Sequence, residues 1–316
     1  MKSPEMVGPV KKRSKFSEKR ALYWKHRYLV FLFIPAVIYY AIFQYGPLYG
    51  IQIAFKNFSA YLGIWKSPWV GFENFKLLFS FPSFRQVFSN TVIISSLKFL
   101  FGFPAPIIFA LLLNEMRVLR FKKAVQTISY LPHFVSWVIL AGLFYQFLSP
   151  STGPINILLQ SLGFTPIYFL ASEVWFRPVL VITSIWKGVG WGSIIYLAAL
   201  SGVDPQLYEA AEIDGAGRLR KAISITLPSL IPVITISLIF SAGNLIKDDF
   251  DQIFNLYNPA VYRVGDVLGT YTYRVGLIEM RYHFSTAVGL FLNVVSFGIL
   301  ILTNAIAKRV NEYGLW

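Results

Sequence analysis

Six apolar stretches alternate with polar segments along the chain. Each approaches or exceeds the roughly 20 residues that a helix needs to cross the hydrocarbon core of a bilayer. We therefore predict an all-α integral membrane protein with six transmembrane helices. The polar segments 149–177 and 247–284 are long enough for short helices along the membrane surface. The predicted spans are Tyr28–Tyr45, Asn90–Leu113, Ala124–Leu148, Pro178–Leu200, Ala222–Ile246 and Ser285–Ala307.

The basic residues fall mainly on one side of these spans. Eighteen Lys and Arg lie in segments 1–27, 114–123 and 201–221 and in the C-terminal tail, against nine in the other connecting segments, whereas the acidic residues divide 8 to 7. Cytoplasmic loops of membrane proteins are enriched in Lys and Arg. We therefore expect a cytoplasmic basic segment at 1–27, a membrane domain at 28–307 and a cytoplasmic tail at 308–316. The basic run at 11–15 also resembles a nucleic-acid patch, but beside a span it fits an orientation signal better.

The composition excludes several classes of protein. Of the 316 residues, 55% are hydrophobic and only 14% are charged, and the net charge is +14. Soluble domains carry about 25% charged residues. The absence of cysteine excludes disulfides, thiolate metal sites and a catalytic thiol. The sequence contains no phosphate-binding loop and no zinc-binding H-E-x-x-H, and the acidic run at 248–251 lacks the glycine and final glutamate of a calcium loop. We expect no catalytic residue, no metal and no cofactor in this chain.

The polar loop at 201–228 separates the fourth and fifth predicted spans. Asp204 can cap a short helix from Pro205 to about Asp214. Gly215 and Gly217 then break it, and a second helix leads into the fifth span. Small alanines beside a glutamate would let this helix end enter a cleft of another protein. An ordinary amphipathic linker remains an alternative on composition alone.

The spacing in this loop adds a specific signal. Glu209-Ala210-Ala211 is followed after three residues by Gly215, then by Ile225 and by Leu227-Pro228. This pattern resembles the EAA loop of ATP-binding-cassette (ABC) importer permeases. The resemblance implies a type I importer fold and a coupling helix that docks into a separate ATPase, with Glu209 making a charged contact and Gly215 turning the chain. The implied coupling residues are Glu209, Ala210, Ala211, Asp214, Gly215, Leu227 and Pro228.

The resemblance extends over nearly the whole chain, including segments 28–35, 45–55, 67–75, 130–137, 250–259 and 272–276. These are similar to carbohydrate-uptake permeases, and more narrowly to the Lpl-type group for alginate, aldouronate and pectin-derived oligosaccharides. The resemblance implies a bacterial cell-membrane protein that works with a second homologous permease, two ATPase subunits that bind ATP and Mg²⁺, and an extracytoplasmic sugar-binding protein. The sequence departs from the EAA-loop pattern at Ala222, and from the Lpl-type group at Asp249 and Gly269.

Candidate substrate contacts combine aromatic and polar side chains. Sugar-binding pockets use mostly apolar walls with a few placed polar groups. Trp191 falls, by resemblance, near a sugar-contacting aromatic of the maltose permease, and the fifth span supplies polar contacts there. Each candidate also has a structural interpretation, namely lipid-interface packing for the tryptophans, snorkelling for Lys247 and helix–helix hydrogen bonding for Asn293. The candidates are Trp186, Trp191, Lys187, Lys98, Asn244, Lys247, Asp248 and Asn293.

Three cations, Lys98, Lys187 and Lys247, favour an acidic sugar such as a uronate oligomer as cargo. His133 follows Pro132, so a structural hydrogen bond suits it better than a ligand contact. The expected function is that of a non-enzymatic permease subunit of an oligosaccharide importer. The alternatives are an autonomous secondary transporter or channel and a membrane scaffold. The predicted spans hold no carboxylate, which disfavours a proton- or sodium-coupled carrier.

Overall fold

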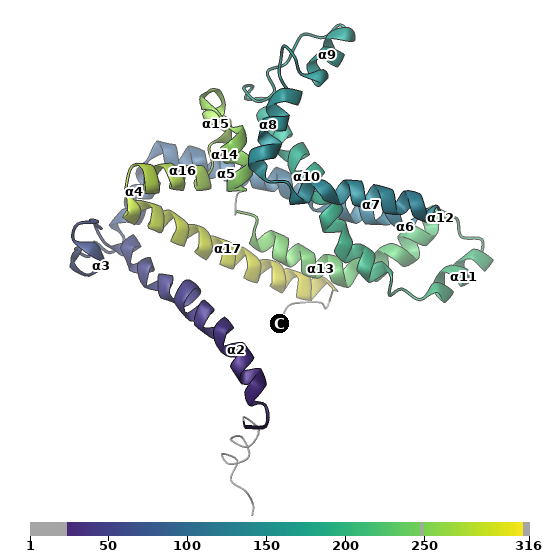
Figure 1. Ribbon diagram of the computed structural model, residues 1–316, viewed down its shortest axis with the longest axis horizontal. Coiled ribbons are helices and arrows are strands. Elements are labelled where there is room, and N and C mark those ends of the chain that lie inside the picture. The colour runs from purple at the N-terminus through teal and green to yellow at the C-terminus, as the bar shows by residue number, and fades with distance from the viewer. Residues whose placement is uncertain (1–23, 247–248, 312–316) are drawn as a thin grey trace, which may run out of the picture. The chain divides into compact units, whose positions relative to one another are not determined.

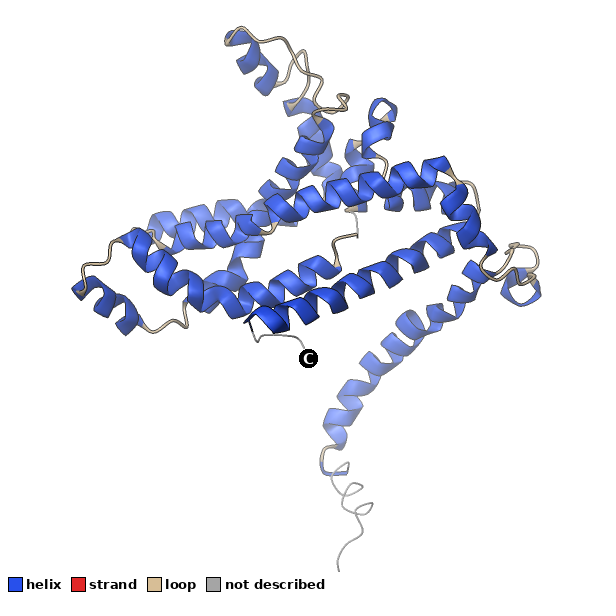
Figure 2. Cartoon of the chain, turned by 180° about the vertical axis from the view of Figure 1, so that it is seen from behind, coloured by secondary structure: helices blue, strands red, loops and turns tan. Residues whose placement is uncertain are grey.

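The computed structural model describes residues 24–246 and 249–311. The candidates Lys247 and Asp248 lie outside the described residues, as do most of segment 1–27 and the end of the tail. Within the described part the chain forms helices joined by loops, together with one isolated bridge between Lys56 and Trp69 (Figures 1 and 2). The predicted all-α class is confirmed.

The chain divides into two compact units, residues 1–52 and 53–316. The first unit contains α2 (Arg27–Tyr40), which continues through a π-helical turn (Ala41–Tyr45) into the 3-10 segment Gly46–Phe55. No residue of α2 is buried, and Pro35 lies inside it. The first predicted span is therefore confirmed within a longer helical stretch.

The second unit contains four further helical stretches that are long and apolar enough to span a membrane. Their boundaries extend those predicted by up to eight residues, because polar first and last turns are hard to place from hydropathy. They are α5 (Pro82–Gly102) with α6 (Pro104–Asn114), α10 (Phe176–Leu200), α12 (Arg218–Lys221) with the π-turn Ala222–Thr226 and α13 (Leu227–Gly243), and α17 (Tyr282–Asn311).

The third predicted span is not one continuous helix. It consists of α7 (Leu119–Phe134) and α8 (Trp137–Phe147), which meet at an angle of 106°. Val135 and Ser136 adopt extended backbone there, and the Ser136 hydroxyl accepts a hydrogen bond from the Ile139 amide as the cap of α8. The described chain thus has five candidate spans, or six if this bent pair is one.

The fifth predicted span also needs a correction. We expected its helix to continue to Ile246, whereas α13 ends at Gly243 and Asn244 caps it.

Helix α10 is the centre of the second unit, because it packs against α5, α6, α7 and α13. Two glycines make this packing possible. A Cβ on Gly190 would lie 2.2 Å from the Ser129 carbonyl oxygen of α7, and one on Gly192 would lie 3.0 Å from Pro106 of α6. Small residues of this kind let membrane helices approach closely. Figures 1 and 2 show α13 and α17 lying side by side.

The two longer polar segments contain short helices, as predicted. Asn90 of α5 donates to the carbonyl oxygens of Arg263 and Asp266, and Arg177 of α10 donates to the Asn90 side chain and to the Val264 carbonyl. These bonds hold segment 259–278 on α5 and α10. Besides α11 (Pro205–Ile213), the short helices described in the second unit include α3 (Gly63–Lys66), α4 (Glu73–Ser80), α9 (Pro154–Ser161), α14 (Phe250–Leu256), η4 (Pro259–Val261), α15 (Tyr262–Gly265), α16 (Leu268–Tyr273) and η5 (Arg274–Ile278).

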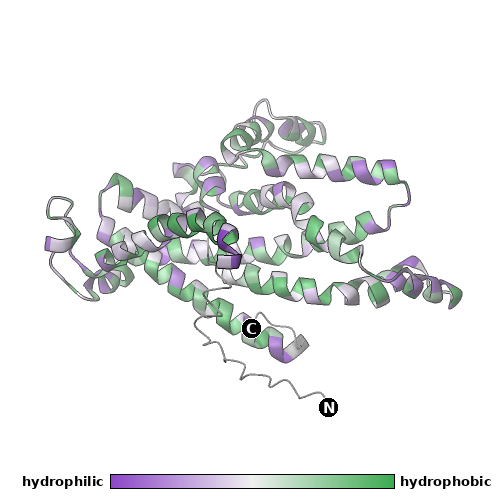
Figure 3. Cartoon of the chain, turned by 60° about the horizontal axis from the view of Figure 1, so that its bottom comes forward, coloured by the Kyte–Doolittle hydropathy of each residue, from purple (hydrophilic) through white to green (hydrophobic). Residues whose placement is uncertain are grey.

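Hydrophobic residues make up much of the long helices, as the colouring by hydropathy shows (Figure 3). Leu100, Ile108 and Leu112 of the α5–α6 stretch, for example, are each more than half exposed. Soluble proteins rarely leave such continuous apolar surface in water. These faces suit lipid or other transmembrane helices.

Replacing Gly190 by alanine should destabilise the second unit, because the added methyl group would collide with the α7 backbone. Overpacking of this kind costs about 1–3 kcal/mol. Gly188 is the matched control, since a Cβ there meets nothing within 4 Å. Thermal unfolding followed by size-exclusion chromatography should show a lower midpoint for Gly190→Ala and an unchanged one for Gly188→Ala. Equal midpoints would contradict this packing.

Candidate functional site

The loop between α10 and α13 folds as its sequence predicts. Helix α11 (Pro205–Ile213) starts at Asp204, whose side chain accepts from the Gln206 amide at 2.9 Å. Gly215 has φ +77°, a left-handed conformation that glycine adopts without steric cost. Gly217 then precedes α12, which continues into α13. The predicted cap, break and second helix are all present.

Two side-chain contacts tie α11 to the helix that follows it. The hydroxyls of Tyr208 and buried Thr226 lie 3.0 Å apart, and Lys221 donates to Glu212 at 3.0 Å. The hydrogen bond and charge of Lys221 lower the pKa of the Glu212 carboxyl. The ion pair therefore persists above the usual pKa of glutamate and is lost only as the pH falls through the lowered value. Because Thr226 directly precedes α13, a movement of α11 would be passed to the first turn of α13.

The outer surface of this loop exposes both charge and apolar area. Glu209 and Ala210 are exposed, and within the described chain no residue pairs with the Glu209 carboxylate. Ile213 is 87% exposed and Leu219 is 75% exposed. Isoleucine and leucine at such exposure form a surface that suits a protein partner. The remaining predicted coupling residues lie around the same loop: Ala211 in α11, Asp214 at its end, and Leu227 and Pro228 in the first turn of α13.

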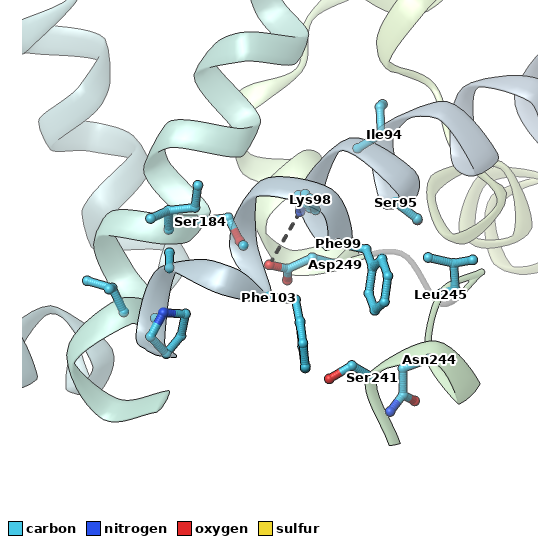
Figure 4. A pocket seen from close by; sticks show the side chains of 16 residues that line it. Ile94, Ser95, Lys98, Phe99, Phe103, Ser184, Ser241, Asn244, Leu245 and Asp249 are labelled. Atoms are coloured by element: carbon cyan, nitrogen blue, oxygen red, sulfur yellow. Dashed lines mark ion pairs between the residues drawn. The ribbon is translucent and has the colours of Figure 1, made fainter. Parts of the chain in front are cut away.

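A cavity of about 390 Å³ lies between α5, α6, α10 and α13 (Figure 4). Phe99 and Phe103 of its wall stack on each other, with ring centroids 5.6 Å apart. Ser241 and Asn244 add polar groups from the end of α13. Of the residues described around this cavity, only Lys98 and Asp249 are charged. Two predicted substrate candidates, Lys98 and Asn244, thus share one cavity.

Lys98 lies in the wall with defined partners. Its ammonium donates to the Gln252 side-chain oxygen and lies 3.7 Å from the Asp249 carboxylate. Gln252 is fully buried, and its amide nitrogen donates to the Leu180 carbonyl and the Thr183 hydroxyl, each at 2.8 Å. A buried cation needs such partners to offset its lost hydration.

Lys187 is held elsewhere, at the break between α7 and α8. Its ammonium donates to the carbonyl oxygens of Pro132, His133 and Val135 at 3.3, 3.0 and 2.5 Å, and it lies 5.4 Å from the centre of the Trp137 ring. These carbonyls lose their helical partners where α7 ends. Lys187 therefore stabilises the bend between α7 and α8 by bonding its carbonyl oxygens, and it does not line the cavity.

The other described candidates, Trp186, Trp191 and Asn293, do not line the cavity either. Trp191 stacks on the His133 ring at 4.6 Å and meets Phe134 edge-on, whereas Trp186 contacts Phe144. Both tryptophans are nearly half exposed. Asn293 lies on an exposed face of α17.

Four residues of this region were not predicted as functional: Phe99, Phe103 and Asp249, which line the cavity, and Gln252, which is buried against Lys98. Phe99 follows Lys98 directly, and Gln252 is the polar residue among the buried side chains of α14. Neither feature predicts a cavity, because the cavity depends on contacts between distant helices. Within the described ranges, no group of three or more His, Asp or Glu side chains could hold a metal ion.

Residues 102–312 match the family described as "Binding-protein-dependent transport system inner membrane component". The chain belongs to this family. The permease is 45% identical over 292 residues to protein LplB of Bacillus subtilis, covering 92% of both chains. It is also 43% identical to YteP of the same organism, a polygalacturonan/rhamnogalacturonan transport system permease protein. This match covers 92% of the permease and 91% of YteP.

A solved structure agrees in fold. The crystal structure of a bacterial ABC transporter involved in the import of the acidic polysaccharide alginate matches 93% of the permease and 99% of that chain, with a TM-score of 0.86 and 41% identity. The same TM-score and identity relate it to a bacterial alginate ABC transporter in complex with an alginate pentasaccharide-bound periplasmic protein. The permease therefore has the type I ABC importer fold, in a multi-pass membrane protein.

Replacing Lys187 by methionine should destabilise the permease, because three carbonyl oxygens at the bend would lose their shared donor. The Pro132 oxygen would keep its bond from the Val135 amide, whereas the His133 and Val135 oxygens would lose the Lys187 donor. A buried acceptor left without a partner costs about 1–3 kcal/mol. Lys123→Met on exposed α7 surface is the control. In detergent, Lys187→Met should lower the unfolding midpoint while Lys123→Met leaves it unchanged. An unaltered midpoint for Lys187→Met would refute this role.

Proposed function

We propose that the permease forms half of a heterodimeric pore that imports acidic oligosaccharides, such as uronate oligomers. The observation that carries the proposal is its similarity, over nearly the full length, to a chain of an alginate importer. A second relative transports polygalacturonan and rhamnogalacturonan, which are also acidic. The ammonium of Lys98 in the cavity wall supports the same class of cargo, because a carboxylate requires a cationic or hydrogen-bonding partner when it leaves water.

The proposed assembly contains a second, homologous permease, two ATPase subunits and an extracytoplasmic sugar-binding protein. ATP and Mg²⁺ bind to the ATPase subunits, where hydrolysis takes place. The binding protein delivers the sugar from outside, as the complex of the alginate transporter with its periplasmic protein suggests. In this arrangement both termini and α11 lie in the cytoplasm, in agreement with the distribution of Lys and Arg.

Helix α11 is the proposed coupling helix. The exposed Ile213 side chain at its end and the exposed Glu209 carboxylate would dock into a groove of one ATPase subunit. The contact of the Tyr208 hydroxyl with the buried Thr226 hydroxyl would transmit the movement of the ATPase to α13. Because α13 contributes to the cavity wall, this movement would reshape the cavity and alternate its access between the two sides.

Replacing Glu209 by lysine should uncouple the complex, because the reversed charge would oppose the ATPase groove. Glu212→Gln on the same helix is the matched control, since Glu212 pairs within the chain. Sugar-loaded binding protein should stimulate ATP hydrolysis strongly in the wild type and in Glu212→Gln, and at least about tenfold less in Glu209→Lys, as expected for a disrupted charged contact at an interface. Co-purification of the subunits would verify assembly. Full stimulation of Glu209→Lys would contradict the coupling role.

Replacing Gly188 by leucine should block transport selectively, because its side chain would fill part of the cavity. Gly142→Leu on α8 is the control, since a Cβ at either glycine meets nothing within 4 Å but Gly142 does not line the cavity. The assay is uptake of a galacturonate trimer into proteoliposomes containing the assembled importer. Uptake should fall severalfold for Gly188→Leu only. Equal uptake by both variants would place the sugar pathway elsewhere.

A further inference from the structure

The charged pair in the cavity wall has two members that are held very differently. Lys98 extends from near the C-terminal end of α5, and its side chain is only 15% exposed. Asp249 immediately precedes α14, and its side chain is 38% exposed. Figure 4 shows the two groups directed toward each other beside Phe99 and Phe103. The pair makes the described wall electrically neutral.

The ammonium of Lys98 is positioned without help from Asp249. Gln252 presents its side-chain oxygen to Lys98 because its amide nitrogen is committed to the Leu180 carbonyl and the Thr183 hydroxyl. Gln252 is fully buried on α14, whose neighbours Ile253 and Leu256 belong to the main hydrophobic cluster. Removing the Asp249 carboxylate would therefore leave the cation in place, directed at the cavity.

Asp249 is held much less firmly. Its carboxylate lies 3.7 Å from the ammonium, beyond hydrogen-bond distance, and its side chain makes no capping hydrogen bond to α14. A partly exposed pair without a hydrogen bond is weak, because water competes with both groups. Another carboxylate that enters the cavity could take the place of Asp249 at little cost.

We propose that Asp249 is an exchangeable counter-ion, which neutralises Lys98 in the empty cavity and gives way to a carboxylate of the sugar. The inference rests on the proposed function, since it assigns an acidic cargo to this cavity. Phe99 and Phe103 offer an apolar wall to the C–H faces of a sugar ring, and Ser241 and Asn244 offer hydrogen bonds to its hydroxyls.

This exchange has a consequence for release. Without the Asp249 carboxylate, the Lys98 ammonium would bind an anionic sugar more tightly and retain it longer. Because Asp249 returns to Lys98 when the sugar leaves, it offsets the loss of that contact and lowers the barrier to release. Asp249 thus limits the affinity for acidic cargo, and its removal should have the opposite effect to the removal of Lys98.

The test measures equilibrium binding of two probes to the nucleotide-free importer complex in nanodiscs. The probes are trigalacturonate and its fully methyl-esterified form, which keeps the sugar rings but lacks charge. Asp249→Asn should tighten trigalacturonate binding about 3- to 10-fold, in the range of partly exposed charge pairs. Lys98→Met should weaken it at least as much, Lys98→Arg should retain most of the affinity, and the double variant should resemble Lys98→Met. Binding of the ester should remain unchanged in all variants.

Three results would overturn the proposal. Asp249→Asn could weaken binding as Lys98→Met does, which would make the pair a structural brace. Both probes could respond equally, so that the charge of the sugar is not sensed here. Trigalacturonate could fail to bind every variant. Uptake of trigalacturonate by the wild-type complex distinguishes these results from a failure of the proposed function. If uptake is normal and one of the three binding results is found, only the exchange of counter-ions is refuted. If the wild-type complex takes up no trigalacturonate, the proposed cargo is refuted.

Discussion

The rest of the structure depends on one interaction, the contact of the Lys187 ammonium with three carbonyl oxygens between α7 and α8. Within a bilayer no water satisfies the backbone groups of a broken helix, so a break persists only where protein groups replace the missing partners. Lys187 supplies them from α10, and Ser136 caps the helix that follows. A basic residue in an apolar span therefore serves here to stabilise a turn of 106°.

That turn determines where the cavity residues lie. It directs α8 onto α14, where the Tyr145 hydroxyl donates to the Leu256 carbonyl and Ala141 joins the cluster formed by Ile253 and Leu256. Fixed in this way, α14 presents Gln252 and Asp249 to Lys98 of α5. The two intramembrane lysines thus have different roles, although their sequence surroundings are similar. One closes a backbone break, and the other faces the space through which a sugar could pass.

Five of the six predicted spans, the cap at Asp204 and the glycine break at Gly215 could be predicted because each depends on local sequence. Hydropathy could not reveal the break in the third span, since Val135 and Ser136 interrupt the helix without interrupting its apolar character. Pro132 and a capping serine four residues later were the available signal. The division of roles between Lys98 and Lys187 was not predictable either, because it depends on which distant carbonyl or carboxylate each ammonium meets. The end of α13 at Gly243 likewise follows from tertiary packing.

We propose that this chain moves an acidic sugar only as part of an ATP-driven assembly. Uptake of radiolabelled trigalacturonate into proteoliposomes tests this, with the permease alone or together with its partner permease, ATPase subunits and binding protein. We expect uptake by the full assembly that requires ATP and the binding protein, and none by the permease alone under a proton or sodium gradient. Gradient-driven uptake by the isolated permease would contradict it.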